Sequence, residues 1–546
     1  MLVEGWQRDQ KPQLASAQSA TKGAAAVDGK GAAGVIPVPQ APTSITPAKP
    51  ATTMATPTAV LATGGQTIRV ETDLLLAEIS TKGGDIRRLE FKEHKGTLDK
   101  SKNLVLFQSV ADNIYIAQSG LIGQEGLPDH RTTYSATSQV YKLATGSQTL
   151  EVRLQAPETS GIKVEQVYKF TRGSYVIDVS YDITNGTDKA LQPHGYFQLV
   201  RDRKPPDGDS AMLPTYTGLA VYTNSEKYQK VSFDDVDKGK TSYAKTSQDE
   251  GWVAIVQHYF LSAFLPKGKI PREFYTKKLD SGLYTAGVVL TAASIPVGGR
   301  SSLSVPLYAG PQDTKTLEKL APGLDLVVDF GILTVIAVPL FMVLHWIHGW
   351  VGNWGIAIIL LTVLIKAIFY PLQAASYKAM AKMKLIAPKM QALKERYGDD
   401  RQRMQKAMME LYQKEKVNPM AGCLPIIVQM PVFIALYWVI LASVELRHAP
   451  FYGWITDLSS VDPWYILPVL MGASMIIQTK LNPVPPDPVQ ARVMQIMPIA
   501  FSVFFFFFPA GLVLYWLVNN ILSIAQQWQI NGAIERANQK RGAAKA

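Results

Sequence analysis

The sequence VMQIMPIAFSVFFFFFPAGLVLYWLVNNILSIAQQWQINGAI, residues 493–534, runs for 42 residues without a single Asp, Glu, Lys or Arg. Two other stretches, residues 330–365 and 417–444, also lack all four charged residue types. A helix that crosses a membrane needs about 20 predominantly apolar residues, and each of these stretches is longer than that. The C-terminal part of the chain is therefore predicted to be a bundle of helices in a bilayer.

The overall composition agrees with a membrane protein. Of the 546 residues, 47% are hydrophobic and 18% are charged, whereas soluble proteins average about 25% charged residues. These values exclude a disordered or fibrous chain and do not fit a purely soluble enzyme. The single cysteine, Cys423, lies in one of the apolar stretches, so the sequence has no disulfide framework. The net charge is +11. In a membrane protein, the loops that carry the positive charges predict its orientation in the bilayer.

The N-terminal half has a different composition. Residues 11–58 consist mainly of Ala, Pro, Thr, Gly and Gln, which cannot bury a core and are typical of a flexible tether. From residue 66 to residue 311, short runs of alternating apolar and polar residues, such as 67–72 and 149–154, are separated by turns rich in Gly and Asn. This pattern predicts a large all-β sandwich.

Residues 330–365 allow two interpretations. One is a tight hairpin of two membrane spans. The other is an interfacial helix at about 330–350, followed by a single span from Trp354 to Gln373. Two His and several Trp residues in this stretch suit the headgroup region of a membrane, but hydropathy alone leaves both interpretations open.

The charged loops predict the orientation of the bundle. Residues 377–416, broken by a Gly-Asp-Asp turn, hold 11 basic and five acidic side chains, and this positive surplus places them in the cytoplasm as a helical hairpin. Residues 445–462 hold one Arg and three acidic residues, which suits the opposite side. Counting spans onward gives five, with a cytoplasmic C-terminus and a periplasmic β domain.

Polar side chains recur on one helix face inside the predicted spans, mostly at four-residue spacing, although each is costly in hydrocarbon. They are Thr362, Lys366, Tyr370 and Gln373 in the first span, Gln429 and Tyr437 in the second, Ser474 and Gln478 in the third, and Tyr515, Asn519, Ser523 and Gln527 in the last. Facing stripes predict a wet cavity with one cation, Lys366. Two alternatives remain at this point: the stripes hold the helices together by hydrogen bonds, or Lys366 snorkels to the interface.

Other function classes find less support. The predicted spans contain no Asp or Glu, which disfavours an ion- or solute-coupled transporter. Histidines of the β domain show no metal-ligand spacing, and the domain has no nucleophile elbow. We therefore expect no enzyme activity, no metal and no cofactor, and keep a membrane-anchored periplasmic carbohydrate-binding protein as a second alternative.

The cytoplasmic hairpin is rich in methionine, which is flexible and suits surfaces that accept varied apolar partners. The candidates for recruiting such partners are Met380, Met383, Met390, Met404 and Met408. The alternative is that they pack the two helices of the hairpin against each other. The basic residues of the hairpin and of the C-terminal tail could meet ribosomal RNA or anionic lipid, or serve only as topology signals.

Several long motifs resemble the YidC family, the bacterial inner-membrane protein insertases of Gram-negative type. In order, they are APGLDL (321–326), VGNWG (351–355), YPL (370–372), SYKAMAKM (376–383), EKVNPMAGCLP (415–425), QMPVFIALY (429–437) and FPAGLVLYW (508–516). The resemblance extends over nearly the whole chain.

This resemblance implies a membrane insertase and chaperone for newly made inner-membrane proteins, acting alone or with the Sec translocon. The fold it implies is a multi-domain chain: a periplasmic β-super-sandwich, similar to sugar mutarotases, and a five-span helical bundle with a groove open to the cytoplasm and to lipid. Lys366 takes the place of the groove cation, and Thr362, Gln478 and Trp516 lie near the substrate. The implied partners are nascent inner-membrane proteins, the Sec translocon, the ribosome and targeting machinery, and membrane lipids.

Two features depart from the family pattern. The groove cation is commonly Arg and is Lys here, which keeps the charge but loses the bidentate fork. The family also begins with a signal-anchor span, of which only the outer edge is expected at Met1–Trp6; we favour a trimmed start.

The resemblance also selects the interfacial helix over the hairpin of spans. The predicted segments are then the end of a signal anchor and a linker at 1–58, a periplasmic β-super-sandwich at 59–320, an interfacial amphipathic helix at 321–353, membrane spans at 354–373, 418–444, 464–480, 494–509 and 511–530, a cytoplasmic helical hairpin at 374–417, a periplasmic loop at 445–463, a cytoplasmic loop at 481–493 and a basic cytoplasmic tail at 531–546.

Overall fold

The structure is a computed structural model. It describes residues 65–110, 113–209, 215–240, 242–398, 400–415, 424–481 and 488–543. The predicted linker at 1–58 lies outside the described residues, as do residues 416–423 and residues 482–487 of the predicted cytoplasmic loop.

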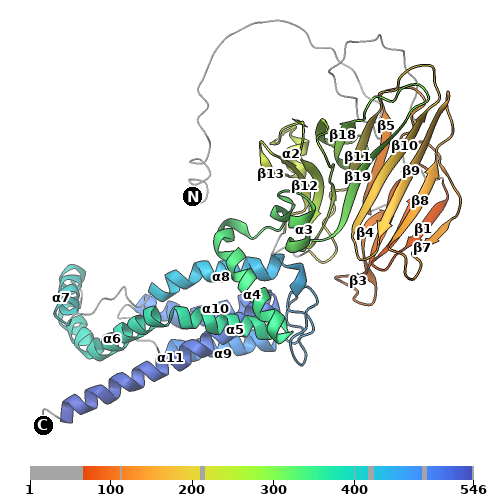
Figure 1. Ribbon diagram of the computed structural model, residues 1–546. Coiled ribbons are helices and arrows are strands. Elements are labelled where there is room, and N and C mark those ends of the chain that lie inside the picture. The colour runs from red at the N-terminus through yellow and green to blue at the C-terminus, as the bar shows by residue number, and fades with distance from the viewer. Residues whose placement is uncertain are drawn as a thin grey trace, which may run out of the picture.

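The N-terminal domain consists of two large sheets (Figure 1). The ten-stranded sheet has, in spatial order, the strands β14 (Thr246–Ser247), β17 (Arg272–Lys278), β18 (Tyr284–Thr291), β11 (His194–Arg201), β5 (Asn113–Ile122), β4 (Asn103–Val110), β3 (Ile86–Lys95), β2 (Leu75–Ser80), β1 (Thr67–Glu71) and β7 (Val140–Lys142). The nine-stranded sheet has β13 (Lys227–Val231), β12 (Gly218–Thr223), β15 (Trp252–Gln257), β16 (Phe260–Phe264), β19 (Arg300–Pro311), β10 (Val176–Asn185), β9 (Ile162–Thr171), β8 (Thr149–Gln155) and β6 (Ser135–Ala136). The predicted all-β super-sandwich is confirmed.

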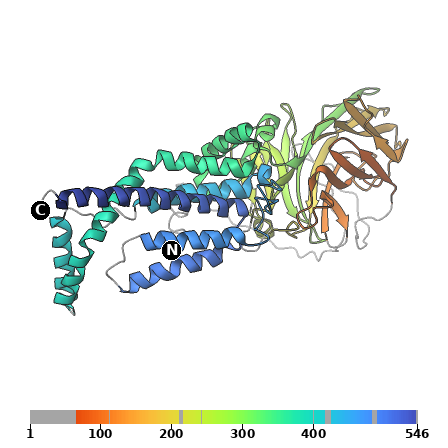
Figure 2. The same cartoon turned by 90° about the horizontal axis from the view of Figure 1, so that it is seen from below.

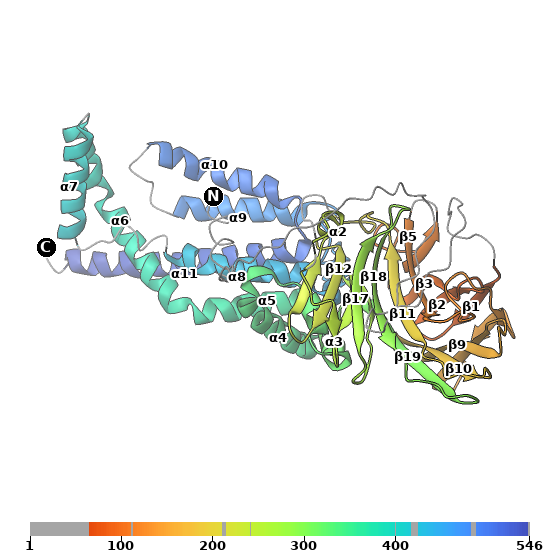
Figure 3. The same ribbon diagram turned by 90° about the horizontal axis from the view of Figure 1, so that it is seen from above.

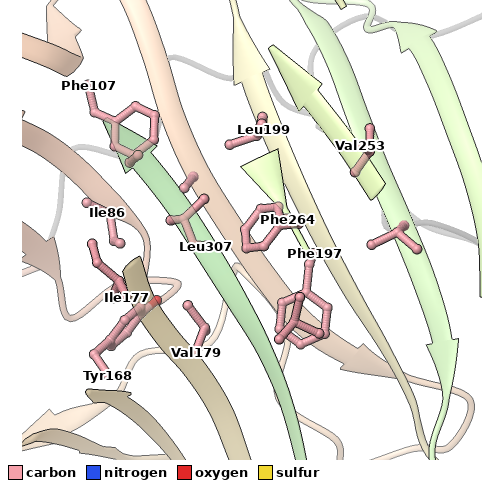
Figure 4. Packing of buried hydrophobic residues seen from close by; sticks show 14 of the residues in the cluster. Ile86, Phe107, Tyr168, Ile177, Val179, Phe197, Leu199, Val253, Phe264 and Leu307 are labelled. Atoms are coloured by element: carbon pink, nitrogen blue, oxygen red, sulfur yellow. The ribbon is translucent and has the colours of Figure 1, made fainter. Parts of the chain in front are cut away.

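The core of this domain lies between the two sheets. Along β10, Ile177, Val179, Tyr181 and Ile183 are buried, whereas the residues between them are partly exposed. This alternation places every second side chain on the inner face. Figure 4 shows side chains of both sheets, among them Phe197 of β11, meeting in this layer.

The C-terminal part is helical. The helices within the described residues are α2 (Phe233–Asp237) in the β domain, then α3 (Thr314–Leu320), α4 (Thr334–Val351), α5 (Trp354–Ile368), α6 (Tyr370–Tyr397), α7 (Arg401–Lys414), α8 (Leu424–Ala442), α9 (Ile466–Leu481), α10 (Pro488–Phe505) and α11 (Ala510–Ala543), with 3₁₀ turns at Leu324–Val327, Gly331–Leu333 and Val444–Leu446. Helices α6 and α7 form the predicted helical hairpin. It lies at one end of the bundle and the β domain lies at the other (Figures 2 and 3).

One apolar core crosses from the β domain into the bundle. It joins Trp252 of β15, Leu317 of α3 and Phe341 of α4 to residues of α5, α8 and α11. The indole Nε1 of Trp252 also donates a hydrogen bond to the Pro322 carbonyl at 3.0 Å, just after α3. The β domain therefore packs directly on one end of the bundle.

The predicted span 354–373 is not one continuous helix, which corrects the expected boundary. α5 ends at Ile368, and α6 leaves it at an angle of 67°. Pro371 explains the break, because it has no N–H to continue the α5 ladder and its ring clashes with the preceding turn. Tyr370 therefore does not continue the stripe of Thr362 and Lys366. It begins α6 and is 46% exposed.

Two further helices extend beyond their predicted ends. α10 begins at Pro488, six residues before the predicted span 494–509. α11 continues to Ala543, through most of the predicted tail at 531–546. Apolar content marks only the part of a helix that suits lipid, whereas Gln, Arg, Lys and Glu are good helix formers and continue it.

Length and composition single out one described helical segment, Gly331–Val351, as long and apolar enough to cross a membrane by itself. α5 and α6 pass the same test as a bent pair, and Ile427–Ala442, Ile466–Leu481 and Arg492–Phe505 are shorter apolar helices. The count of five spans and the interfacial position of α4 both remain predictions. Figure 1 shows α4 running obliquely across the end of the bundle nearest the β domain.

Candidate functional site

Lys366 lies in the last turn of α5 and is only 7% exposed. Its Nζ donates to Ser523 Oγ of α11 at 2.5 Å and to Gln373 Oε1 of α6 at 3.4 Å. Ser523 Oγ in turn donates to the Asn519 carbonyl at 2.7 Å. The ammonium group thus joins three helices inside the protein, and it does not reach outward as a snorkelling lysine would. The bend at Phe369 is what brings Gln373 back toward it.

α11 presents polar groups to two sides. On one side Asn519 accepts a hydrogen bond from Gln429 Nε2 of α8. On the other, Asn520 Nδ2 donates to Ser474 Oγ of α9 at 3.1 Å, and Ser474 Oγ donates to the Met471 carbonyl. The facing stripes predicted from the sequence are therefore linked by hydrogen bonds, and α11 is the helix that they share.

The two aromatic candidates of α11 lie beside this polar cluster. Tyr515 stacks on Phe433 of α8, and Trp516 meets the same ring edge-on at a centroid distance of 4.5 Å. The buried Nε1 of Trp516 has no hydrogen-bond partner among the described residues. Thr362 is buried, but its Oγ1 donates to the Ile358 carbonyl of its own helix at 2.7 Å. The indole N–H of Trp516 therefore remains available to donate a hydrogen bond to a polar segment of a substrate. The hydroxyl of Thr362 is already used within α5, so Thr362 would contribute only its van der Waals surface.

Two other candidates are less closely tied to the cluster. Gln478 is half-buried, one turn beyond Ser474 on α9. The backbone carbonyl of Tyr370 accepts a hydrogen bond from Gln526 Nε2 of α11 at 3.4 Å.

The hairpin methionines divide by position. Met390 is buried, and Met383 and Met408 pack against it inside the hairpin, as the packing alternative expected. Met380 and Met404 are half-buried. Among the methionines of the hairpin, Met409 has the largest free surface, with 58% exposed, and it is not one of the five candidates.

A strict spacing of four residues does not find Asn520. It directly follows Asn519 in an otherwise apolar run, and two adjacent amides cannot share one helix face. The pair was therefore a signal that α11 has polar partners on two sides.

The electrostatics of the cluster are unusual for a buried cation. Among the residues that the structure describes, Lys366 has only neutral oxygen partners, and no carboxylate lies within ion-pair distance. A buried charge without a counter-charge is costly. Lys366 is therefore well suited to attract water or an acceptor-rich polar segment into the bundle.

Comparison with known proteins covers both halves of the chain. The family model described as the YidC periplasmic domain matches residues 67–343, and that described as the 60Kd inner membrane protein matches residues 346–538. A protein of Nitrosospira multiformis named membrane protein insertase YidC is 53% identical over 98% of this chain and 95% of its own length. This chain belongs to the YidC family. The YidC of Aromatoleum aromaticum, also named a membrane protein insertase, is likewise 53% identical, over 100% of this chain and 96% of its own.

Among solved structures, the crystal structure of an active YidC insertase with its first transmembrane domain resolved matches 85% of this chain and 92% of its own, with a TM-score of 0.40 and 18% identity. The membership in the YidC family rests on the sequence relatives and the family models.

Proposed function

We propose that this YidC-family chain inserts membrane proteins by holding the polar part of a substrate at the cluster around Lys366. The observation that carries the proposal is a buried cation whose partners, Ser523 and Gln373, are neutral. Gln429 and Asn519 extend the polar surface across α8 and α11, and Trp516 supplies a further donor. The action needs no covalent chemistry, so no catalytic residue is assigned.

The driving force comes from the apolar segment of the substrate. While its polar terminus or loop sits in the groove, the hydrophobic segment slides out between the helices into lipid. Burial of apolar surface is worth roughly 25 cal/mol per Å², so a segment of about 20 residues releases enough free energy to move the polar part across. The short apolar helices α9 and α10 would thin the bilayer on this path.

We place the β domain in the periplasm and the α6–α7 hairpin in the cytoplasm of an inner-membrane protein with α5, α8, α9, α10 and α11 as its five spans. The net positive hairpin supports this orientation, because it lies at the end of the bundle away from the β domain (Figure 2). The same basic surface, with exposed Met409, suits a ribosome or targeting factor as partner. The Sec translocon is proposed from the family resemblance alone.

The test is insertion of a small single-span protein into proteoliposomes that contain the purified chain. Lys366→Glu is expected to lower the amount of protease-protected substrate about tenfold, because it replaces the attracting charge by a repelling one at a buried site. Lys366→Met should lie between this variant and the native chain. Lys189→Glu is the matched control, since Lys189 is exposed in the β domain, away from the hairpin, and carries the same charge change.

Folding of each variant is checked by its yield and by circular dichroism. Equal protection with all three variants would contradict the proposed role of Lys366, while insertion itself would stand. An equal loss with Lys366→Glu and Lys189→Glu would point to a general charge effect instead of a groove.

A further inference from the structure

The segment between α8 and α9, residues 443–465, covers the end of the bundle that faces the β domain; we call it the cap loop. It accepts hydrogen bonds from the first N–H groups of α11: Ala510 N donates to the Ser460 carbonyl at 2.7 Å and Gly511 N to the Leu458 carbonyl at 2.9 Å. The first N–H groups of a helix have no partner within it. The cap loop thus supplies the partners that α11 lacks.

The cap loop also holds the starts of two other helices. Asp462, almost fully buried, accepts from Leu467 N of α9 at 2.7 Å and from Trp454 Nε1 at 2.9 Å. Asn353, the N-cap of α5, reaches the Phe451 carbonyl at 3.3 Å. One segment of the chain therefore ties together α5, α9 and α11.

The fit beneath the cap loop is tight at Gly511. A Cβ placed there would lie 3.1 Å from the Leu458 oxygen, 3.4 Å from Ile358 of α5 and 3.5 Å from Ile440 of α8. Leu458 and Ile440 are almost completely buried. Four elements meet at this point, and an added carbon atom would touch three of them, with the Leu458 oxygen having to give by a few tenths of an ångström; such close packing is the geometry of a closed end.

The cap loop is organised around Asp457, which is 6% exposed. Its carboxylate accepts hydrogen bonds from the backbone and hydroxyl of Ser459, the hydroxyl of Ser460 and the backbone N–H of His448. Burial opposes ionisation of Asp457, but the hydroxyl donors and the charge of Lys100 outweigh it and hold its pKa below the usual value. Asp457 is therefore an anion at neutral pH.

The cation that faces this anion belongs to the β domain. Lys100, in the turn between β3 and β4, donates from Nζ to Asp457 Oδ2 at 3.1 Å. A second tie runs the other way, from Arg447 of the cap loop to the Lys95 carbonyl and to Thr97 Oγ1 at 3.2 Å. A cleft of about 580 Å³ between the β domain and the cap loop, lined in part by Asp457, borders these contacts, so water has access to this junction.

We propose that the cap loop seals the β-domain end of the bundle and that Lys100, acting through Asp457, positions it, so that the β domain sets how often this end opens to water. In the orientation proposed above, the seal faces the periplasm. The proposed orientation decides only which compartment the seal faces, and the seal itself does not depend on it. Lys100 is a positioning residue, because it touches the cap loop and not the substrate.

The experiment measures access to the space beneath the cap loop. The single cysteine, Cys423, is replaced by serine and Ile440 by cysteine in the full-length protein in proteoliposomes. A membrane-impermeant maleimide then labels the new thiol from the β-domain side. Lys100→Met is expected to speed the labelling about fivefold, the effect of losing one partly exposed ion pair on a local opening equilibrium.

The matched control is Lys102→Met, because Lys102 lies in the same turn but pairs with exposed Asp99; it should label at the native rate. Lys100→Arg, which keeps the charge, should restore slow labelling. Equal labelling rates for Lys100→Met and Lys102→Met would overturn the proposal.

Insertion is assayed on the same proteoliposomes, so that the two proposals fail separately. If Lys100→Met labels faster but Lys366→Glu leaves insertion unchanged, the proposed role of Lys366 is contradicted and the proposed role of the cap loop is supported. If Lys100→Met labels at the native rate but Lys366→Glu lowers insertion, the proposed role of the cap loop is contradicted and that of Lys366 is supported.

Discussion

Trp252→Ala is expected to lower the free energy of unfolding of the β domain by about 4 kcal/mol, the usual cost of deleting a large buried aromatic side chain. Trp252 is 1% exposed and stacks on Tyr222 of the neighbouring strand with ring centroids 5.7 Å apart. It also lies in the core that joins the β domain to the bundle. Its loss should therefore loosen both the sheet and the junction.

Two further variants separate these contributions. Trp252→Phe keeps much of the stacking and loses the hydrogen bond to the Pro322 carbonyl, so it should cost about 1 to 2 kcal/mol. Val297→Ala, at an exposed turn residue of the same domain, should cost less than about 0.5 kcal/mol. Thermal unfolding of the full chain, followed by circular dichroism and by hydrogen exchange of α3, is the measurement. Equal melting temperatures for Trp252→Ala and Val297→Ala would contradict the role of this residue.

Asp85→Asn is expected to stabilise the β domain at pH 8 by about 4 kcal/mol, the cost of ionising a carboxyl whose pKa is raised from 3.8 to about 7, and to have little effect near pH 4. Asp85 is 1% exposed, between the two sheets, where Gln118 Nε2 donates to it at 3.1 Å and Arg87 lies 3.5 Å away. Burial raises the pKa of its carboxyl to about 7, although Gln118 and Arg87 each lower it in part. Asparagine resembles the neutral acid that the fold prefers.

The sign of the pH dependence follows from the raised pKa. In the unfolded chain the carboxyl ionises near its ordinary value of 3.8, whereas in the fold it stays protonated up to about 7. The stability of the native chain therefore falls as the pH rises from about 4 to about 7 and levels off above that. Asp188→Asn, at an exposed turn, is the control. Hydrogen exchange of β5 at several pH values measures the effect, and a pH-independent difference between Asp85→Asn and the native chain would refute it.

The architecture could be predicted from the sequence because both the β domain and the helical bundle show a clear pattern of apolar residues. Alternating residues of the sheets, such as Ile177 and Val179 of β10, and the charge-free runs of the bundle both record which side chains are buried. The four-residue spacing also found Lys366 and Asn519. Hydropathy, however, cannot tell a span from an interfacial helix, so the position of α4 relative to the membrane stays a prediction.

Other features could not be read from periodicity. The break at Phe369 depends on one proline, Pro371, and a stripe drawn through it wrongly included Tyr370. The cap loop depends on pairs far apart in sequence, such as Lys100 with Asp457, whose meeting is fixed by how the β domain packs on the bundle.

The bend between α5 and α6 has a mechanical consequence. α6 carries Pro388 in its interior, where a proline bends a helix, so only its first part acts as one rod. From Phe369 to Pro388 this part is about 28 Å long, and Gln373 sits only about 6 Å from the pivot at Phe369. A lever with these arms multiplies a force applied at Pro388 about fivefold at Gln373, while it divides the displacement by the same factor. A push of about 5 Å at Pro388 would thus shift Gln373 by about 1 Å, enough to break its 3.4 Å contact with Lys366. A force on this part of α6 is therefore transmitted directly to a hydrogen bond of the buried cation.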